Sequence, residues 1–277
     1  MIHDLPALCR QIRRDILSMT HAAGSGHPGG SLSAVEILVS LYFGQMRLDP
    51  ARPDDPNRDR FLLSKGHAAP LLYSVLARRG YFDPALLPTL RQLGSPLQGH
   101  PHMAKLPGLD CSSGSLGQGL SIANGLALAA RRTGRTYRTY CLLGDGELQE
   151  GQVWEAFMFA HHYKLDNLCV IIDNNGLQID GAVDKVMSPY PIPDKLKAFG
   201  FAVKEIDGHD FDQMEAAFAE AKATKGVPFA IVMKTTKGKG VSYMENQAGW
   251  HGKAPNDEEY KIAMDELTAQ LAEVEAM

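Results

Sequence analysis

The stretch LLGDGELQEG, at residues 142–151, sets an acidic side chain between two glycines directly after an apolar run. Asp145 can point past the end of a strand there, and Gly144 and Gly146 let a ligand approach the main chain closely. A carboxylate in such a turn can bind a cation, or it can cap the helix that follows. The motif is short, so by itself it leaves both functions open.

A second polar segment, DNNGLQIDG at residues 173–181, follows the next apolar run along the chain. A parallel crossover brings consecutive strands in with the same polarity, so Asp145 can lie beside the amides of Asn174 and Asn175. Carboxylate and amide oxygens are ligands for hard cations. The two segments together predict a metal site built from oxygen ligands.

The elements that must position these residues alternate along the chain. The predicted strands cover residues 60–64, 136–143, 168–173, 201–206 and 228–234. The predicted helices cover residues 5–19, 68–79, 117–132, 151–163, 195–200 and 212–223. Another helix is predicted to start near Ser33, with Glu36 in capping-box register, and a charged helix is predicted from about Asp257. Apolar strands that alternate with helices predict an α/β fold, with a mostly parallel sheet covered by helices on both faces.

The composition excludes several classes of protein. With 277 residues, 44% hydrophobic and 22% charged, the chain is long enough for a sizeable core, and it has no repeat or obvious linker, which favours one domain. A net charge of −4 with scattered basic residues gives no footprint for nucleic acid. The widely spaced cysteines are expected to be reduced packing residues: Cys9, Cys111, Cys141 and Cys169.

The first fifteen residues mix charges with apolar side chains, and no apolar run reaches 18 residues. We therefore expect no signal peptide and no membrane segment, and a cytoplasmic location.

The spacing of the two polar segments carries a family resemblance. A gap of 27 residues, 147–173, separates GDG from the asparagine pair and fits one helix and one strand. This pattern resembles the metal motif of thiamine diphosphate enzymes, where Mg²⁺ also binds two diphosphate oxygens and a water. The resemblance implies that Asp145, Asn175 and the carbonyl of Leu177 hold the ion, and that Gly146 contacts the cofactor.

Further stretches resemble transketolase in particular. They are SGHPGGSLSAVEIL at 25–38, RDRFLLSKGHAAPLLYSVL at 58–76, GHPHMAKLPGLDCSSGSLGQGLSIANGLALA at 99–129 and KTTKGKGVSYMENQAGWHG at 234–252. The resemblance covers almost the whole chain. It implies a three-layer thiamine-diphosphate-binding fold, in which 1–277 form a single domain of the diphosphate-binding type with a C-terminal helix from about 257.

The resemblance also assigns histidines. His67 would donate a hydrogen bond to the diphosphate, although it could instead cap a helix, and His251 would contact both diphosphate and substrate. His27 and His100 would line the substrate channel above the thiazolium ring, a catalytic position where a pKa near 6.5 allows proton transfer. The other histidines are expected to be unassigned (His102), partly exposed and structural (His161, His162) or at the surface (His3, His21, His209).

The segment at residues 114–116 resembles the loop that flanks the aminopyrimidine ring. It would place Gly114, Ser115 and Leu116 against the cofactor, although Ser115 replaces a common proline. Three later glycines are expected to let the next helix pack closely or to contact the ligand: Gly117, Gly119 and Gly125.

The implied activity is transfer of a two-carbon ketol unit from a ketose, expected to be phosphorylated, to an aldose acceptor. The bond chemistry would belong to thiamine diphosphate. Two alternatives stay open: the decarboxylating subunit of a 2-oxo acid dehydrogenase, and a non-catalytic cofactor-binding relic. The set of His27, His67 and His100 argues against the dehydrogenase subunit. The sequence does not select the sugar pair.

The resemblance ends where transketolases continue into a pyrimidine-binding domain, whose glutamate promotes ylid formation. The closing segment NDEEYKIAMDELTAQLAEVEAM, at 256–277, is too short to replace that domain and would act as a dock or cover. We therefore expect a separately encoded C-terminal subunit that supplies the domain and the glutamate, in a two-plus-two heterotetramer.

Overall fold

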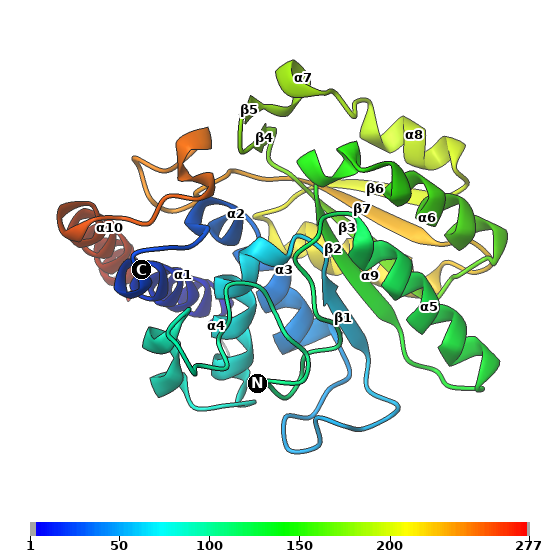
Figure 1. Ribbon diagram of the computed structural model, residues 1–277. Coiled ribbons are helices and arrows are strands. Elements are labelled where there is room, and N and C mark those ends of the chain that lie inside the picture. Colours follow the sequence, from blue (N-terminus) through cyan, green and yellow to red (C-terminus); the bar gives the residue numbers. More distant parts are fainter. Residues whose placement is uncertain (1–3, 276–277) are drawn as a thin grey trace.

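The computed structural model describes residues 4–275, and its centre is a parallel sheet (Figure 1). Within the described chain this sheet has five strands in the order β1-β2-β3-β7-β6, and every neighbouring pair is parallel. The strands are β1 (Arg60–Leu63), β2 (Thr139–Gly144), β3 (Leu168–Asn174), β6 (Ala202–Asp207) and β7 (Phe229–Lys234). A separate antiparallel pair is formed by β4 (Leu177–Gln178) and β5 (Gly181–Ala182).

Helices and short helical turns connect the strands. The α-helices are α1 (Leu5–Ala23), α2 (Pro28–Leu32), α3 (Val35–Ser40), α4 (Ala69–Arg79), α5 (Gln118–Arg132), α6 (Gly151–His162), α7 (Val183–Val186), α8 (Ile192–Ala198), α9 (Phe211–Ala223) and α10 (Asp257–Glu275). The other turns are η1 (Leu41–Gln45), η2 (Gly66–Ala68), η3 (Pro84–Thr89), η4 (Gly146–Gln149) and η5 (Ala248–His251).

Strand β2 shows why the sheet strands are almost continuously apolar. Tyr140 and Leu142 pack with α1, α3, α4 and α9 on one face, whereas Cys141 and Leu143 pack with α5, α6 and α8 on the other. Because successive side chains of a strand point to opposite faces, a sheet covered twice needs apolar residues at every position. The expected three-layer α/β fold is confirmed.

The segment around Ser33 differs from the prediction. A helix does start near Ser33, because α3 begins at Val35, but its N-cap is Ala34, and the short helix α2 already covers Pro28–Leu32. The hydroxyl of Ser33 donates to Asp173 at 2.6 Å, and Glu36 forms an ion pair with Arg13 at 2.5 Å. The capping box was therefore wrong, because buried charged partners from elsewhere in the fold bind both side chains.

The glycines of the α5 region behave in two ways. A Cβ at Gly119 would lie 2.6 Å from Ser64 Oγ, and one at Gly117 would lie 2.8 Å from Glu150 Cβ, so both positions require glycine for close packing. A Cβ at Gly125 would meet no atom within 4 Å. The packing role expected for Gly125 was wrong, since this residue lies on the exposed side of α5.

The charged C-terminal helix α10 covers α1 and lies beside it in Figure 1. Tyr260 and Ser18 share a hydrogen bond of 2.9 Å between their hydroxyls, and Arg14 donates to Thr268 at 2.5 Å. Leu267 is fully buried in this contact. This element therefore serves as a cover for the first helix.

The cysteines are free thiols, as expected, and all but the half-buried Cys111 are buried. Among residues 4–275, no helix combines the length and the apolar character that crossing a bilayer requires.

Candidate diphosphate and metal site

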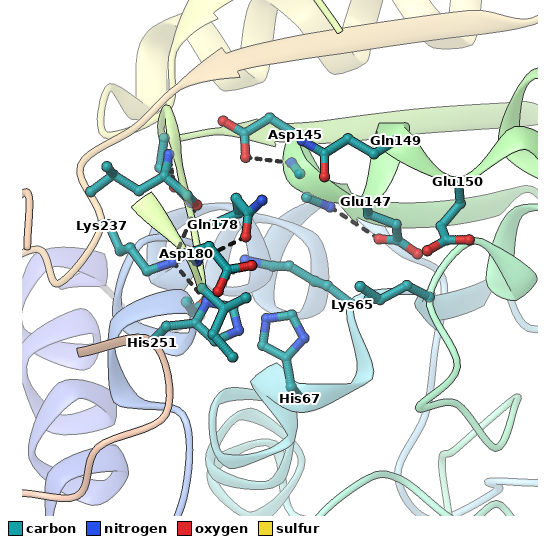
Figure 2. Close-up of a pocket in the computed structure, with 17 residues that line it drawn as sticks. Lys65, His67, Asp145, Glu147, Gln149, Glu150, Gln178, Asp180, Lys237 and His251 are labelled. Carbon is teal, nitrogen blue, oxygen red and sulfur yellow. Dashed lines mark hydrogen bonds between the residues drawn. The ribbon is translucent and has the colours of Figure 1, made fainter. Parts of the chain in front are cut away.

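A cavity of about 260 Å³ opens at the carboxyl ends of β2 and β3. The two strands are in register here, with Gly144 opposite Asp173, so the GDG turn and the asparagine segment end side by side. Figure 2 shows Asp145, Lys65 and Lys237 around this cavity, with His67 and His251 on one side of it. It lies at the edge of the sheet where α/β proteins bind ligands.

Asp145 is almost completely buried, with 1% of its surface exposed. Its carboxylate accepts hydrogen bonds from the N–H of Gly146 at 2.8 Å and of Gly176 at 2.6 Å. Burial raises the pKa of this carboxyl to about 6, and the neighbouring Asp173 contributes in the same direction. None of the ion pairs within residues 4–275 includes Asp145. A buried carboxylate without a paired cation suits a metal ion.

Asn175 and Leu177 bring the other oxygens to the same cavity. The side-chain oxygen of Asn175 accepts from the N–H of Leu177 at 3.1 Å, and the carbonyl of Leu177 lies 3.2 Å from the Lys237 ammonium. The described residues contain no group of three or more His, Cys, Asp or Glu placed to hold a metal. One carboxylate, one amide and one carbonyl fit Mg²⁺, which usually keeps phosphate oxygens and water in its shell.

A buried ion pair supports the floor of the cavity. Lys65 lies against Asp173 and donates to the carbonyl of Gly30 at 2.7 Å. Asp173 also accepts from the hydroxyls of Ser33 and Thr235, and these partners hold its pKa below the usual value despite its burial. The cluster joins the ends of β1, β3 and β7 to α2. Sequence reasoning assigned no role to either charged residue, although Asp173 directly precedes the asparagine pair and Lys65 directly precedes GHA.

Lys237 is a second buried cation that sequence reasoning missed. Its side chain is 2% exposed, and its ammonium lies 2.9 Å from Nδ1 of His251. Burial and the nearby Lys65 lower its pKa to about 8. The available signal was its position in KTTKGKG, a lysine that precedes a glycine three residues after a strand. A buried ammonium facing this cavity suits an anionic ligand.

Four histidines converge beside the cavity. The ring centroids of His27 and His67 are 5.2 Å apart, those of His67 and His251 4.8 Å, and those of His27 and His100 6.3 Å. Burial lowers the pKa of His27 to about 4 and of His251 to about 3, and it also lowers the pKa values of His67 and His100. All four rings are therefore neutral near pH 7, so each can both donate and accept a hydrogen bond.

The segment 114–116 reaches the site in part. Leu116 lines the cavity, whereas Gly114 packs against His100 and Ser115 is exposed outside the lining. Buried Glu147 ties this loop to the GDG turn, because it accepts from the N–H of Gly117 at 2.8 Å, from that of Gly144 at 3.1 Å and from the Ser64 hydroxyl. Sequence reasoning did not assign Glu147.

The remaining histidines lie away from the cavity. His209 is not a surface residue: it contacts Glu36 at 3.1 Å and accepts from the N–H of Thr236 at 3.0 Å, because the loop after β7 covers it. His21 is half-buried and stacks on Tyr260. Exposed His161 contacts the Gly200 carbonyl, His162 is exposed, His102 accepts from the N–H of Ala104, and His3 lies outside the described residues.

The chain is an α/β domain whose doubly covered parallel sheet presents a buried carboxylate, two buried lysines and neutral histidines at its carboxyl edge, where domains of this class bind ligands. Residues 7–273 match the family described as transketolase, thiamine diphosphate binding domain. The chain belongs to this family.

Some relatives of similar length are named as separate transketolase subunits. The chain is 44% identical, over 97% of its length and 98% of the relative, to a 6-deoxy-6-sulfo-D-fructose transketolase subunit of Clostridium sp. (strain MSTE9). It is 41% identical, over 95% of its length and 93% of the relative, to an apulose-4-phosphate transketolase subunit of Phocaeicola vulgatus.

Longer transketolases match through one part of their length. Human transketolase is 46% identical over 88% of this chain, but the match spans 38% of the human protein. The crystal structure of Campylobacter jejuni transketolase superposes with a TM-score of 0.89 and 34% identity, over 97% of this chain and 43% of that one.

Proposed function

We propose that the chain binds thiamine diphosphate and Mg²⁺ and forms the diphosphate-binding subunit of an enzyme that transfers a two-carbon ketol unit. The observation that carries the proposal is the convergence of Asp145, Asn175 and the Leu177 carbonyl on one cavity, with the Lys237 ammonium beside them. The family match supports the same cofactor.

The residues of this chain divide the binding work. Asp145, Asn175 and the Leu177 carbonyl would hold the metal ion, and Lys237 and His67 would neutralise and orient the diphosphate. Gly146 lines the same cavity and would contact the cofactor. A Cβ at this position would lie 2.9 Å from Gln178 Cβ, so glycine is required for close packing against β4. When bound, thiamine diphosphate would supply the nucleophilic carbon on which a ketose is cleaved.

The histidines would serve the substrate. His27, His100 and His251 lie close together and are neutral near pH 7, so they can donate to a carbonyl oxygen or accept a proton from a hydroxyl. Leu116, with Gly114 and Ser115 in the same loop, would flank the aminopyrimidine ring.

The substrate class follows from the relatives. One is named for 6-deoxy-6-sulfo-D-fructose and another for apulose 4-phosphate, and both sugars carry an anionic group at the far end. We propose an anionic ketose as donor and an aldose as acceptor. The particular pair stays open.

A second subunit would complete the active site. The chain spans about two fifths of the single-chain transketolases it matches, whereas it spans nearly all of the Phocaeicola relative, which is named as one subunit of its enzyme. We propose that a separately encoded C-terminal subunit supplies the pyrimidine-binding domain and the activating glutamate, in a two-plus-two assembly. A cytoplasmic location is part of the same proposal.

Co-expression tests this function. The chain is purified alone and with the product of an adjacent reading frame, and both samples are screened with phosphorylated and sulfonated ketoses plus an aldose acceptor. We expect ketol transfer by the complex, dependent on thiamine diphosphate and Mg²⁺, and none by the chain alone. Transfer by the chain alone would refute the partner. Release of carbon dioxide from a 2-oxo acid, without ketol transfer, would favour a dehydrogenase subunit.

A further inference from the structure

Arg91 has a backbone conformation that its side chain disfavours. It lies in the loop after η3 with a φ of 61°, one of few non-glycine residues of the described chain with a positive φ. Its N–H donates to the carbonyl of Leu97 at 2.8 Å, which closes the loop. Such strain persists where the surrounding structure fixes it, and it is concentrated at active sites and ligand clamps.

The guanidinium of Arg91 lies between the two loops that carry channel histidines. Its Nη1 donates to Ser25 Oγ at 3.1 Å, two residues before His27. On the other side it packs on Gly99, where a Cβ would come within 2.9 Å of the guanidinium carbon, directly before His100. The positive charge reaches both rings, since it contributes after burial to the lowered pKa values of His27 and His100.

No carboxylate neutralises this cation in the part of the chain that the structure describes. Three arginines that are packed into the fold do have one: Arg13 pairs with Glu36, Arg58 with Asp110 and Arg78 with Asp15. Arg91 instead is exposed and borders an open hollow that Lys105 and Gln98 also line. A guanidinium that is fixed in place, unpaired and exposed can bind an anion through two parallel hydrogen bonds.

We propose that Arg91 is a specificity-determining residue, which binds the anionic group of the sugar substrate at the His100 side of the channel. The inference rests on the proposed ketol transfer and adds to it a contact made by this chain rather than by the partner subunit. A phosphate and a sulfonate offer the same array of acceptor oxygens. The site would therefore distinguish anionic from uncharged sugars, but not a phosphate from a sulfonate.

Steady-state kinetics of the assembled complex test the proposal. The donors are the best anionic ketose found in the screen and the same ketose without its anionic group, with an uncharged aldose as acceptor. Arg91→Met should raise KM for the anionic donor at least tenfold and leave kcat and the KM of the uncharged donor within threefold. The KM of Arg91→Lys for the anionic donor should lie between those of the wild-type and Arg91→Met enzymes, because lysine keeps the positive charge but lacks the planar guanidinium.

Two further variants separate ligand binding from a structural role. Arg91→Gly removes the cation and the strained φ together, so it should show the same KM pattern as Arg91→Met with an unchanged or higher Tm. Arg132→Met removes an equal charge from the exposed end of α5 and should leave both donors unaffected. A lower Tm in Arg91→Gly, with equal losses for both donors, would identify Arg91 as a structural prop and overturn the proposal.

A binding measurement decides the matter even if the complex transfers no ketol unit. Inorganic phosphate is titrated into the chain while the imidazole protons of His100 are followed by NMR. The wild-type chain should show a saturable shift that Arg91→Met lacks. Equal shifts in both proteins would overturn the anion contact, whereas absence of ketol transfer by the wild-type complex would overturn only the proposed function.

Discussion

At the scale of single residues, the site combines charges that a folded chain ordinarily avoids. Asp145 is buried without an ion-pair partner, and Lys237 is buried with an ammonium that faces a neutral imidazole. Each group is costly in the ligand-free chain, because desolvation disfavours its charged form. Each would be compensated by a bound ligand of opposite charge, Mg²⁺ for the carboxylate and diphosphate for the ammonium.

The buried carboxylate of Asp145 predicts opposite effects of one substitution on stability and on cofactor binding. Its folded-state pKa of about 6 exceeds 3.8, so the folded chain binds this proton more tightly, and the associated stability is lost as pH rises from about 4 through 6. At pH 7.5 in EDTA, Asp145→Asn should raise the free energy of unfolding by about 1–2 kcal/mol, after about 1 kcal/mol is subtracted for a weakened acceptor. Chemical denaturation measures this change.

The same variant should lose Mg²⁺-dependent binding of thiamine diphosphate by the complex, measured by calorimetry. Asp184→Asn removes an exposed carboxylate of α7 and serves as the control, with binding unchanged. Near-normal cofactor affinity in Asp145→Asn would remove this residue from the metal site.

The histidines should separate by role. His67 lines the cavity, so His67→Ala should raise the thiamine diphosphate concentration needed for half-maximal activity about tenfold or more. His27→Ala and His100→Ala should instead lower kcat about 10²-fold or more with cofactor saturating. Kinetics at varied cofactor concentration checks both. Equal effects on cofactor affinity at all three positions would contradict the division.

The lowered pKa of His27 predicts an acid-sensitive fold. The folded-state value of about 4 lies below 6.5, so the unfolded chain binds the proton more tightly, and stability is lost as pH falls from about 6.5 towards 4. His27→Gln should therefore reduce the drop in Tm of the cofactor-free chain between pH 7 and pH 5. His162→Gln, at an exposed position of α6, is the comparison variant.

At the scale of elements, the Lys65–Asp173 pair fastens the strand ends that form the site. Asp173→Asn would leave the Lys65 ammonium buried and unpaired, so it should destabilise the chain by about 3–5 kcal/mol in urea denaturation. Asp265→Asn breaks the exposed pair with Lys261 and should leave the free energy of unfolding almost unchanged. Equal losses from both variants would show that the buried pair has no special structural weight.

The sequence predicted the elements well, because strands covered on both faces are long apolar runs and glycines mark where helices end. Gly80, for example, ends α4 in the left-handed conformation. The sheet order was not predicted: β7 lies between β3 and β6, and adjacency in the chain does not encode this arrangement. The β4–β5 pair was also missed, since strands of two residues have no periodicity.

The site was predicted where one motif contributes several neighbours, as at Asp145 and Asn175. Site residues were missed where a single side chain is contributed by a segment distant in the sequence. Lys237 and Asp173, for example, are 64 residues apart in the chain yet lie close enough to interact electrostatically. Burial creates their altered pKa values and pairings, and burial of an isolated lysine cannot be read from its neighbours in sequence. His209 was misplaced for the same reason.

At the scale of the whole molecule, the chain presents apolar side chains that its own fold leaves uncovered. Ile122 of α5 and Met158 and Phe159 of α6 are 41%, 55% and 37% exposed, and Ile179 beside the cavity is 63% exposed. Exposed apolar groups at this density are typical of proteins that associate with a partner. The proposed partner subunit offers one reason for their presence.

Native mass spectrometry tests the assembly. Mixing the chain with its proposed partner should give a mass equal to two copies of each, and the species should persist at low micromolar concentration, as expected of a large obligate interface. The chain alone, at 30.2 kDa per copy, should give no species that retains thiamine diphosphate. A stable one-to-one complex would contradict the two-plus-two stoichiometry.

The solitary buried carboxylate of Asp145 has a consequence for the life of the protein in the cell. The buried charge destabilises the ligand-free protein, and bound metal and cofactor would offset this destabilisation. Binding of metal and cofactor would therefore slow both unfolding and proteolysis. Newly assembled copies would therefore survive in proportion to the available thiamine diphosphate. The supply of thiamine diphosphate would thus affect the abundance of the protein as well as the activity of each copy.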